Sequence, residues 1–146
     1  MIEKQSITHS AQETRAFGEE LAREILPGTL LCLSGDLGAG KTTFTQGFLE
    51  GFGAVRPYVS PTFVIMKQYD LPKPFNGVDC IYHVDAYRVE SKDFETIGFS
   101  QWCEDKKGIV ILEWPERVVE LLPEKRVEIH FKNLSENERK IKIVSQ

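Results

Sequence analysis

Long hydrophobic runs are missing from this sequence of 146 residues. No apolar stretch approaches the roughly 20 residues that a helix needs to cross a bilayer. The first residues also lack the charged-then-apolar order of a secretory signal. These two absences argue against a helical membrane protein and against a secreted one. They predict a cytoplasmic protein that has no membrane partner.

Cysteine is scarce as well. The three cysteines, Cys32, Cys80 and Cys103, form no C-x-x-C pair and lie among apolar or aromatic residues. We therefore expect small buried thiols rather than disulfides, zinc ligands or a redox pair. The chain can bury a core without such crosslinks, because 41% of its residues are hydrophobic and 27% are charged. Its length predicts one domain over residues 1–146.

Positive charge is in short supply too. The chain has 18 lysines and arginines against 22 acidic residues, which gives a formal net charge of −4, and it contains no run of basic residues. Proteins that bind nucleic acid by themselves usually carry a basic face, because neutralising phosphates supplies most of the affinity. We therefore expect no tight, independent binding to RNA or DNA.

Glycine, by contrast, is concentrated in the segment LSGDLGAGKTTF, residues 33–44. Within it, Gly35 is followed after four residues by Gly40, Lys41 and Thr42, which is the G-x-x-x-x-G-K-[ST] pattern of a phosphate-binding loop. The glycines let successive N–H groups point inward, and the helix that begins near Lys41 adds its positive dipole end. We expect Lys41 to reach the β- and γ-phosphates and the Thr42 hydroxyl to bind Mg²⁺.

The same segment offers further contacts to a nucleotide. Thr43 is the next residue with a free N–H, near the expected α-phosphate. A chance match to the loop pattern is expected in roughly one of 200 sequences of this length, from average residue frequencies. A buried strand before the loop and a helix after it make chance less plausible still. The nucleotide-binding residues predicted in this segment are Asp36, Gly38, Ala39, Gly40, Lys41, Thr42 and Thr43.

Apolar patterns around the loop indicate alternating helices and strands. Ser10 and Glu13 form an S-x-x-E capping box, which predicts a helix that Pro27 and Gly28 end. The run TLLCL at 29–33 is typical of a strand covered on both faces in a parallel sheet. After the loop, the segment KTTFTQGFLEGFG predicts a second helix, with Phe44, Phe48 and Leu49 facing inward.

The second half of the chain predicts further strands and short helices. We expect strands over Thr62–Tyr69 and Cys80–Tyr87, joined by a loop rich in proline and glycine, and one or two helices after Ser91 as cap. Gly108 leads into the apolar strand IVILE, and RVEIHFK and RKIKIV predict an antiparallel pair. The fold class is therefore α/β: a P-loop NTPase-like, three-layer fold with a mixed, mostly parallel sheet flanked by helices, and antiparallel hairpins.

Two carboxylates follow predicted strands and are candidates for a Mg²⁺-nucleotide site. Glu113 follows the more apolar strand, so we assign it to the metal, directly or through water. Asp85 follows a mixed strand, and we expect it to act as a nearby acid or as a base that orients water. Each could instead be a solvated carboxylate at a strand end. The predicted catalytic residues are Lys41, Asp85 and Glu113, and the predicted metal ligands are Thr42 and Glu113.

Hydroxyl groups in the segment VSPTF are candidates for a nucleotide-dependent switch. Ser60 and Thr62 flank Pro61, and a threonine in such a place can sense the γ-phosphate through Mg²⁺. The alternative, a strand entry with turn-forming residues, is about equally well supported. On the apolar strand that follows, we expect His83 to be a satisfied core histidine rather than a base. Trp114 fits stacking and packing equally.

The motifs GDLGAGKTTF, SPTF, HVDAYR and LEWPERV occur in an order and at spacings that resemble the TsaE (YjeE) family of bacterial ATPases. The resemblance extends from about Ser10 to Val144. The loop alone is generic to P-loop proteins, whereas its combination with SPTF and EWPE is specific to this family. The resemblance implies an ATPase needed for the threonylcarbamoyl modification of adenosine 37 in tRNAs that read codons beginning with A.

The resemblance also implies partners and residue roles. It implies action on the TsaB–TsaD pair, which transfers the threonylcarbamoyl group, so that tRNA is contacted only indirectly. ATP hydrolysis would then drive or reset that complex rather than perform the transfer. The adenine would lie between the first helix and the carboxy-terminal hairpin, near Ala11 and Arg139. The residues that the resemblance assigns to phosphate, Mg²⁺ or hydrolysis are Lys41, Thr42, Glu113 and Asp85.

Three other functions are compatible with a phosphate-binding loop, but the rest of this sequence supports them less well. A GTPase needs an N-K-x-D element to read guanine, and the sequence has none. A small-molecule or nucleotide kinase usually brings an arginine-bearing lid, and no arginine-rich insert is present. The third function is a binding module. In it, bound nucleotide would stabilise one conformation of the protein, and hydrolysis would contribute little to function. The kinase is the runner-up among enzymes.

Overall fold

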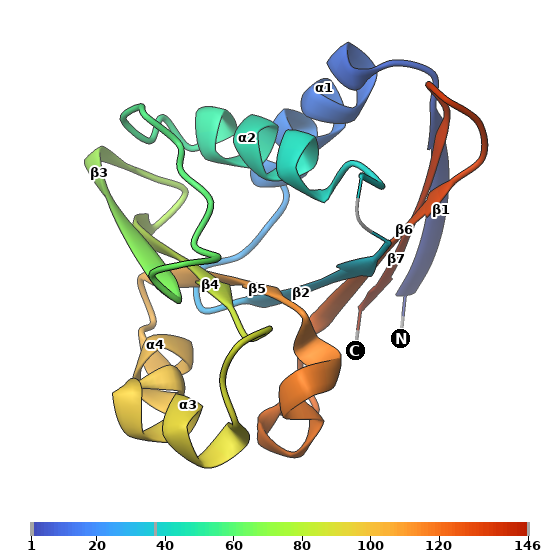
Figure 1. Ribbon diagram of the computed structural model, residues 1–146. Coiled ribbons are helices and arrows are strands. Elements are labelled where there is room, and N and C mark those ends of the chain that lie inside the picture. The colour runs from blue at the N-terminus through green and yellow to red at the C-terminus, as the bar shows by residue number, and fades with distance from the viewer. Residues whose placement is uncertain (1, 37, 146) are drawn as a thin grey trace.

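The computed structural model describes residues 2–36 and 38–145, and one sheet runs through its middle (Figure 1). Its helices and strands, in chain order, are β1 (Ile2–Thr8), α1 (Ala11–Ala22), β2 (Leu30–Gly35), α2 (Lys41–Gly51), β3 (Met66–Phe75), β4 (Val78–Asp85), α3 (Ser91–Ile97), α4 (Phe99–Glu104), β5 (Gly108–Glu113), the 3₁₀ helix η1 (Pro115–Leu121), β6 (Val127–Asn133) and β7 (Arg139–Ser145).

The strands lie in the order β1-β7-β6-β2-β5-β4-β3. The central strands β6, β2, β5 and β4 run parallel, and the outer pairings, β1 with β7, β7 with β6 and β4 with β3, are antiparallel. Helices α1 and α2 cover one face, and α3, α4 and η1 cover the other (Figure 1). The predicted three-layer α/β fold, with a parallel centre and antiparallel hairpins, is confirmed.

The burial of β2 explains why its sequence is continuously apolar. Alternate side chains of a strand point to opposite faces of the sheet. Leu31 and Leu33 accordingly pack in the core beneath α1 and α2, while Leu30 and Cys32 pack in the core beneath the other helices. Burial raises the pKa of the Cys32 thiol to about 12, which leaves it protonated and unreactive at neutral pH. The expectation of a buried, free thiol is confirmed at this position.

Helices α1 and α2 pack so closely that glycine is required where they cross. A Cβ atom on Gly47 of α2 would lie 1.9 Å from the backbone oxygen of Arg15, and one on Gly18 of α1 would lie 2.2 Å from the backbone oxygen of Phe44. Because both obstacles are backbone atoms, neither can move aside alone. This contact fixes how α1 lies against α2. The first residues of both helices line the pocket described below.

The hairpin of β3 and β4 differs from the sequence-based expectation. Thr62 does not begin a strand: Ile65 donates its N–H to the Pro61 oxygen at 2.7 Å, which forms a turn, and β3 starts at Met66. The predicted loop over 70–79 is instead strand up to a tight turn at Asn76, whose φ is 50°. The two prolines are tolerated because β3 is an edge strand, where a missing N–H breaks no ladder bond.

The structure differs from the sequence-based expectations at two other places: it has a strand that was not predicted, and it has a different helix cap. Strand β1, which pairs with β7 along its whole length, was not predicted, because its sequence IEKQSIT shows no regular alternation of apolar and polar residues. Ser91 was expected to cap a helix, but Glu90 holds that position, and the Ser91 hydroxyl donates to Glu120. The Ser10 cap is confirmed: its hydroxyl accepts from the Glu13 N–H at 3.1 Å. Every helix over the described ranges is too short or too polar to cross a membrane.

We predict that Gly47→Ala destabilises the protein although alanine is the better helix former. In an ordinary helix interior this change gains roughly 1 kcal/mol, but here the added methyl meets the Arg15 backbone, and overpacking of this kind costs about 2 kcal/mol or more. Urea unfolding measures the difference. Glu20→Ala, at an exposed position of α1, is the control and should change stability little. A Gly47→Ala protein as stable as the unchanged chain would contradict the observed helix contact.

Candidate functional site

Three parallel strands end at the same edge of the sheet and bring their last residues together. β2 ends at Gly35, β4 at Asp85 and β5 at Glu113, and Asp85 lies directly opposite Glu113 in the register of β4 and β5. Open α/β sheets bind ligands in the crevice at the carboxyl ends of their strands. The chain then passes from Gly35 through the glycine loop to the N-terminus of α2, so the loop and both carboxylates share one crevice.

Two glycines shape the loop. Gly40 caps α2 with a φ of 99°, a left-handed conformation that other residues rarely adopt. Gly35 lies so close to β6 that a Cβ atom would come within 2.4 Å of the backbone oxygen of Phe131. Gly40 leads directly into α2, whose first N–H groups have no partner within the helix. The predicted loop residue Ala39 is buried, and its N–H donates to the Asp36 oxygen at 3.1 Å.

The Lys41 side chain is held inside the crevice. Its ammonium group donates to the Gly35 backbone oxygen at 2.8 Å and lies 4.7 Å from the centroid of the Trp114 ring. Lys41 is only 6% exposed. A buried ammonium with one hydrogen bond and an aromatic face has donors left for another acceptor, since an ammonium can donate three times. This geometry suits the binding of an anion.

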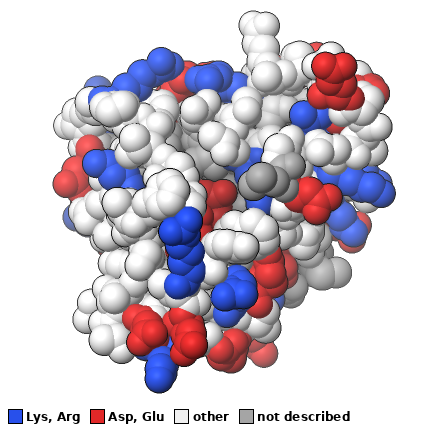
Figure 2. Space-filling view, in the orientation of Figure 1, with Lys and Arg blue, Asp and Glu red and all other residues white. Residues whose placement is uncertain are grey.

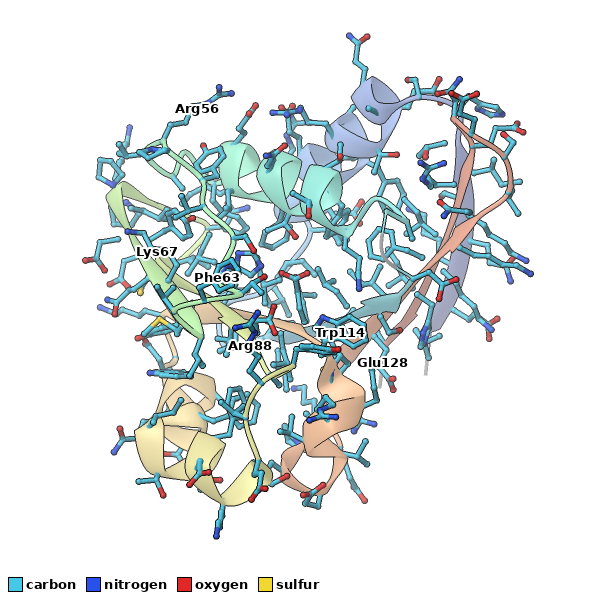
Figure 3. The ribbon with its side chains drawn as sticks, in the orientation of Figure 1. Arg56, Phe63, Lys67, Arg88, Trp114 and Glu128 are labelled. Carbon is cyan, nitrogen blue, oxygen red and sulfur yellow. The ribbon has the colours of Figure 1, made fainter. Side chains whose placement is uncertain are left out.

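Trp114 follows Glu113 directly and has a strained backbone. Its φ of 62° and ψ of 49° are left-handed, a conformation that costs a non-glycine residue roughly 1–3 kcal/mol. The turn places its ring between Lys41 and Tyr87, whose ring centroid is 4.8 Å away. Figure 3 shows Trp114 beside the end of β5, at the start of η1. The structure shows the Lys41 ammonium over the Trp114 ring and a tilted contact with Tyr87, at an interplanar angle of 52°. Trp114 therefore packs within the site, and its ring faces the lysine.

Asp85, at the end of β4, forms a hydrogen bond with the segment that contains Ser60 and Thr62. Thr62 donates its hydroxyl to Asp85 Oδ2 at 3.3 Å, and Tyr87 donates its N–H to Asp85 Oδ1 at 2.8 Å. Ser60 and Thr62 share a hydrogen bond of 2.7 Å between their hydroxyls. The Asp85 N–H also donates to the oxygen of Ile65, a β-branched residue with a φ of 71°. Strain and polar contacts thus gather where the segment meets the strand.

Glu113 has one oxygen in use and one free. Its Oε2 lies 2.8 Å from Nε2 of His83, and no residue among those described donates to Oε1. Together with the exposed Thr42 hydroxyl and the Asp85 carboxylate, Glu113 supplies oxygen ligands of the kind that Mg²⁺ prefers. Mg²⁺ usually takes one or two protein carboxylates and completes its shell with phosphate oxygens and water, so this donor set fits that ion.

A cavity of about 380 Å³ connects these groups and extends past them. This volume falls in the range of small-molecule sites, roughly 300–1,000 Å³. Most residues predicted from the sequence line it, whereas Asp36 and Ala39 do not. The lining residues that the sequence prediction had not placed in the site are Ser10, Thr14, Trp114, Glu136 and Asn137. Ser10, Thr14, Glu136 and Asn137 lie within three residues of Ala11 or Arg139, and Trp114 directly follows Glu113. This proximity is the sequence signal that could have found them.

Arg139 holds the turn between β6 and β7 at the rim of the cavity. Its guanidinium donates to the backbone oxygens of Ser135, Glu136 and Glu138, at 2.9, 3.1 and 3.0 Å. Its aliphatic stem packs against the loop, because the Cγ atom lies 3.6 Å from the position of a Cβ on Gly40. One guanidinium nitrogen, Nη1, makes all three of these bonds, and the stem of Arg139 faces the loop.

Arg88 follows Asp85 by three residues but does not line the cavity. Its guanidinium sits over the ring of Phe63, 4.6 Å from the centroid, and Phe63 is 80% exposed. Figure 3 labels both side chains, and neither residue lines the cavity. On the face seen in Figure 2, basic and acidic side chains are interspersed rather than gathered into one basic surface.

Comparisons with known proteins found a matching family model, similar sequences and a similar solved structure. A family model described as "Threonylcarbamoyl adenosine biosynthesis protein TsaE" matches residues 8–141. The tRNA threonylcarbamoyladenosine biosynthesis protein TsaE of Bacillus subtilis is 41% identical over 134 residues, which are 92% of this chain and 80% of that protein. Its counterpart from Treponema pallidum is 36% identical over 138 residues, 94% and 97% of the two chains. The crystal structure of Bacillus subtilis YdiB is similar with a TM-score of 0.75 and 35% identity, over 99% of this chain and 86% of that one.

We predict that Arg139→Ala loosens the turn between β6 and β7 without unfolding the sheet. The guanidinium holds three backbone oxygens at once, and alanine leaves the oxygens of Ser135 and Glu136 without this donor, while the Glu138 oxygen still accepts from the Leu134 N–H. Hydrogen exchange measured by mass spectrometry should show faster exchange in residues 134–138 and unchanged exchange in β2 and β5. Arg126→Ala, which removes a contact to the Pro123 oxygen away from the cavity, is the control. Unchanged exchange in 134–138 would contradict the role of Arg139.

Proposed function

The chain belongs to the TsaE family, and we propose that it is the ATP-binding and ATP-hydrolysing subunit of tRNA threonylcarbamoyladenosine biosynthesis. The family match over residues 8–141 supports a role in this biosynthesis. The nucleotide part rests on one observation: the buried Lys41 ammonium, the N-terminus of α2 and two carboxylates meet in one cavity. The glycine loop supplies the backbone donors that a polyphosphate requires.

The phosphates would bind at the loop and the start of α2. In this structure Lys41 donates to the Gly35 oxygen, and it would exchange that acceptor for oxygens of the β- and γ-phosphates. Backbone N–H groups of the loop and of Thr43 would cradle the remaining phosphate oxygens. We assign Gly38, Gly40, Lys41, Thr42 and Thr43 to the phosphates and Ala11 and Arg139 to the base. Asp36 and Ala39, which do not line the cavity, would support the loop through their backbone hydrogen bond.

The adenine end of the cavity lies between α1 and the turn after β6. Ala11 and Arg139 both line the cavity at this end. The stem of Arg139 packs beside Gly40 while its Nη1 holds the turn, so we assign the base contact to this stem and to the turn. Glu136 and Asn137 then offer polar groups beside the base. Apolar contact with a few polar groups is the usual composition of such a site.

Hydrolysis would use the carboxylates at the strand ends. Mg²⁺, held by Thr42 and Glu113, would neutralise charge on the phosphates. Asp85 would orient or deprotonate the attacking water, since it lies opposite Glu113 and lines the cavity. Ser60 and Thr62 would report the state of the nucleotide, because the Thr62 hydroxyl already contacts Asp85. Loss of the γ-phosphate would thus change the conformation of the segment at Thr62 and of the exposed Phe63 next to it.

In this proposal the partners carry the transfer chemistry. The subunit acts in the cytoplasm on the TsaB–TsaD complex, which transfers the threonylcarbamoyl group to adenosine 37 of tRNAs reading codons that begin with A. The net charge of −4 and the mixed charges of the visible face suit a subunit that contacts tRNA only through that complex. A kinase remains the second candidate, favoured only by the generic phosphate loop, and transfer of phosphate to an added small acceptor would reveal it.

We predict that Lys41→Ala removes nucleotide binding, whereas Glu113→Ala mainly raises the Mg²⁺ concentration that binding requires. The first change removes the buried ammonium, and the second removes a metal ligand. Fluorescence of a labelled ATP analogue, titrated at several Mg²⁺ concentrations, separates the two effects. Lys140→Ala, on β7 outside the cavity lining, is the control and should bind as the unchanged chain does. Full tRNA modification by both site variants would refute the assignment.

We also predict that the isolated chain hydrolyses ATP slowly and that TsaB, TsaD and tRNA accelerate it. An arginine finger contributes roughly 10³–10⁵ in rate, and Arg88 lies over Phe63 rather than at the loop. Reconstitution that follows phosphate release and the modified nucleoside together tests this. Turnover that stays unchanged when the partners are added would contradict the prediction, and turnover that stays negligible with them would favour a binding module.

A further inference from the structure

His83 is buried beside the candidate metal ligand and has no assigned role in the site. It lies in β4, two residues before Asp85, and is 5% exposed. Residues two apart in a strand point to the same face, so His83 and Asp85 both face the α1 and α2 side. The facing strand β5 presents Ile111 opposite His83 and Glu113 opposite Asp85. His83 therefore contacts Glu113 diagonally, at 2.8 Å between Nε2 and Oε2.

The hydrogen bond fixes where the imidazole carries its proton. An ionised carboxylate only accepts, so Nε2 must donate, and the neutral ring then has a bare Nδ1. Nδ1 is buried and has no hydrogen-bond partner among the described residues. The expectation of a satisfied core histidine is thus wrong for this atom. A buried polar atom without a partner destabilises the folded protein, so packing alone would be better served by an apolar residue.

We propose that His83 is a positioning residue: its Nε2–H holds Oε2 of Glu113 and leaves Oε1 to serve the metal. The inference rests on the proposed Mg²⁺ role of Glu113. A carboxylate tied at one oxygen loses less rotational freedom when the other oxygen binds. Carboxylates and histidines behind metal ligands commonly act in this way, and their removal weakens metal affinity roughly 10–100-fold.

The surroundings of the pair support this assignment. Glu113 and Thr42 line both the main cavity and a small cavity of about 30 Å³, and His83 lines only the small one. His83 thus stands behind Glu113 as seen from the nucleotide site. Since Nε2 donates to the carboxylate, His83 cannot also act as the base that accepts a proton from water at that atom.

Two variants of His83 separate the donor from the packing. In His83→Gln the side-chain nitrogen lies as many bonds from Cα as Nε2 does, so the donor to Glu113 is kept. In His83→Asn the nitrogen takes the place of Nδ1, and the donor is lost. His130→Phe is the control, because His130 lies in β6, outside the cavity lining, and its ring bonds to the Ser34 hydroxyl. Circular dichroism checks that each variant folds.

The first measurement is the Mg²⁺ concentration that gives half-maximal binding of a labelled ATP analogue. We expect His83→Asn to raise it about tenfold, and His83→Gln and His130→Phe to change it less than about threefold. Binding of the analogue without Mg²⁺ should be the same in all four proteins. Equal effects of the glutamine and asparagine variants, or no effect of either, would overturn the proposal. Absence of Mg²⁺-dependent binding by the unchanged chain would overturn the proposed function with it.

The second measurement needs no nucleotide and no metal. Long-range ¹H–¹⁵N correlation spectra of the unchanged chain distinguish the two neutral imidazole forms, and the His83→Gln spectrum identifies the His83 signals among the three histidines. We expect the form with the proton on Nε2. In Glu113→Gln this preference should weaken, because the acceptor changes. A proton on Nδ1 in the unchanged chain would overturn the positioning role even if nucleotide binding proceeds as proposed.

Discussion

The close approach of the glycine loop to β6 and α2 is the constraint on which the rest of the site depends. Gly35 leaves no room for a side chain beside the Phe131 oxygen, and Gly40 takes a left-handed conformation at the head of α2. The chain therefore turns from a buried strand directly into a helix whose first N–H groups face the crevice. Lys41 comes next and points back to the Gly35 oxygen. Asp85 and Glu113, at the ends of β4 and β5, line the same cavity as this turn.

In β4 and β5, the apolar residues of the core come first and the polar residues of the candidate site come last. On the face beneath α1 and α2, β5 presents Ile109 and Ile111 to the core and then ends on Glu113. β4 presents Ile81 and then turns polar at His83 and Asp85. The apolar part of each strand fixes the register, and the register places the polar ends opposite each other. Backbone strain is found at the same edge, at Ile65 and Trp114, where the surrounding contacts hold it.

Local patterns in the sequence predicted what a short segment determines by itself. The loop, the buried strand before it, the Ser10 cap and the two carboxylates at strand ends all belong to this class. The prolines in β3 misled the prediction, because a sequence does not show that a strand lies at the edge of a sheet. Strand β1 was missed because its stability comes from pairing with β7 at the far end of the chain.

Contacts between distant segments could not be predicted. The stacking of Trp114 on Lys41 requires a left-handed turn at a bulky residue. The bond from His83 to Glu113 is a diagonal across two strands, visible only once their register is known. The hydrogen bonds from Arg139 to the β6–β7 turn contribute to the cavity only because the β6–β7 hairpin lies beside the start of α1. Each contact joins elements whose relative placement the fold decides.

The central claim is that the turn after β2 forms a ready cage for a triphosphate. Isothermal titration calorimetry of the unchanged chain with ATP in the presence of Mg²⁺ tests it most directly. The account predicts saturable heat from a single site, and weaker heat with AMP, which lacks the β- and γ-phosphates that Lys41 would contact. No heat with ATP and Mg²⁺, either for the chain alone or together with TsaB and TsaD, would contradict it.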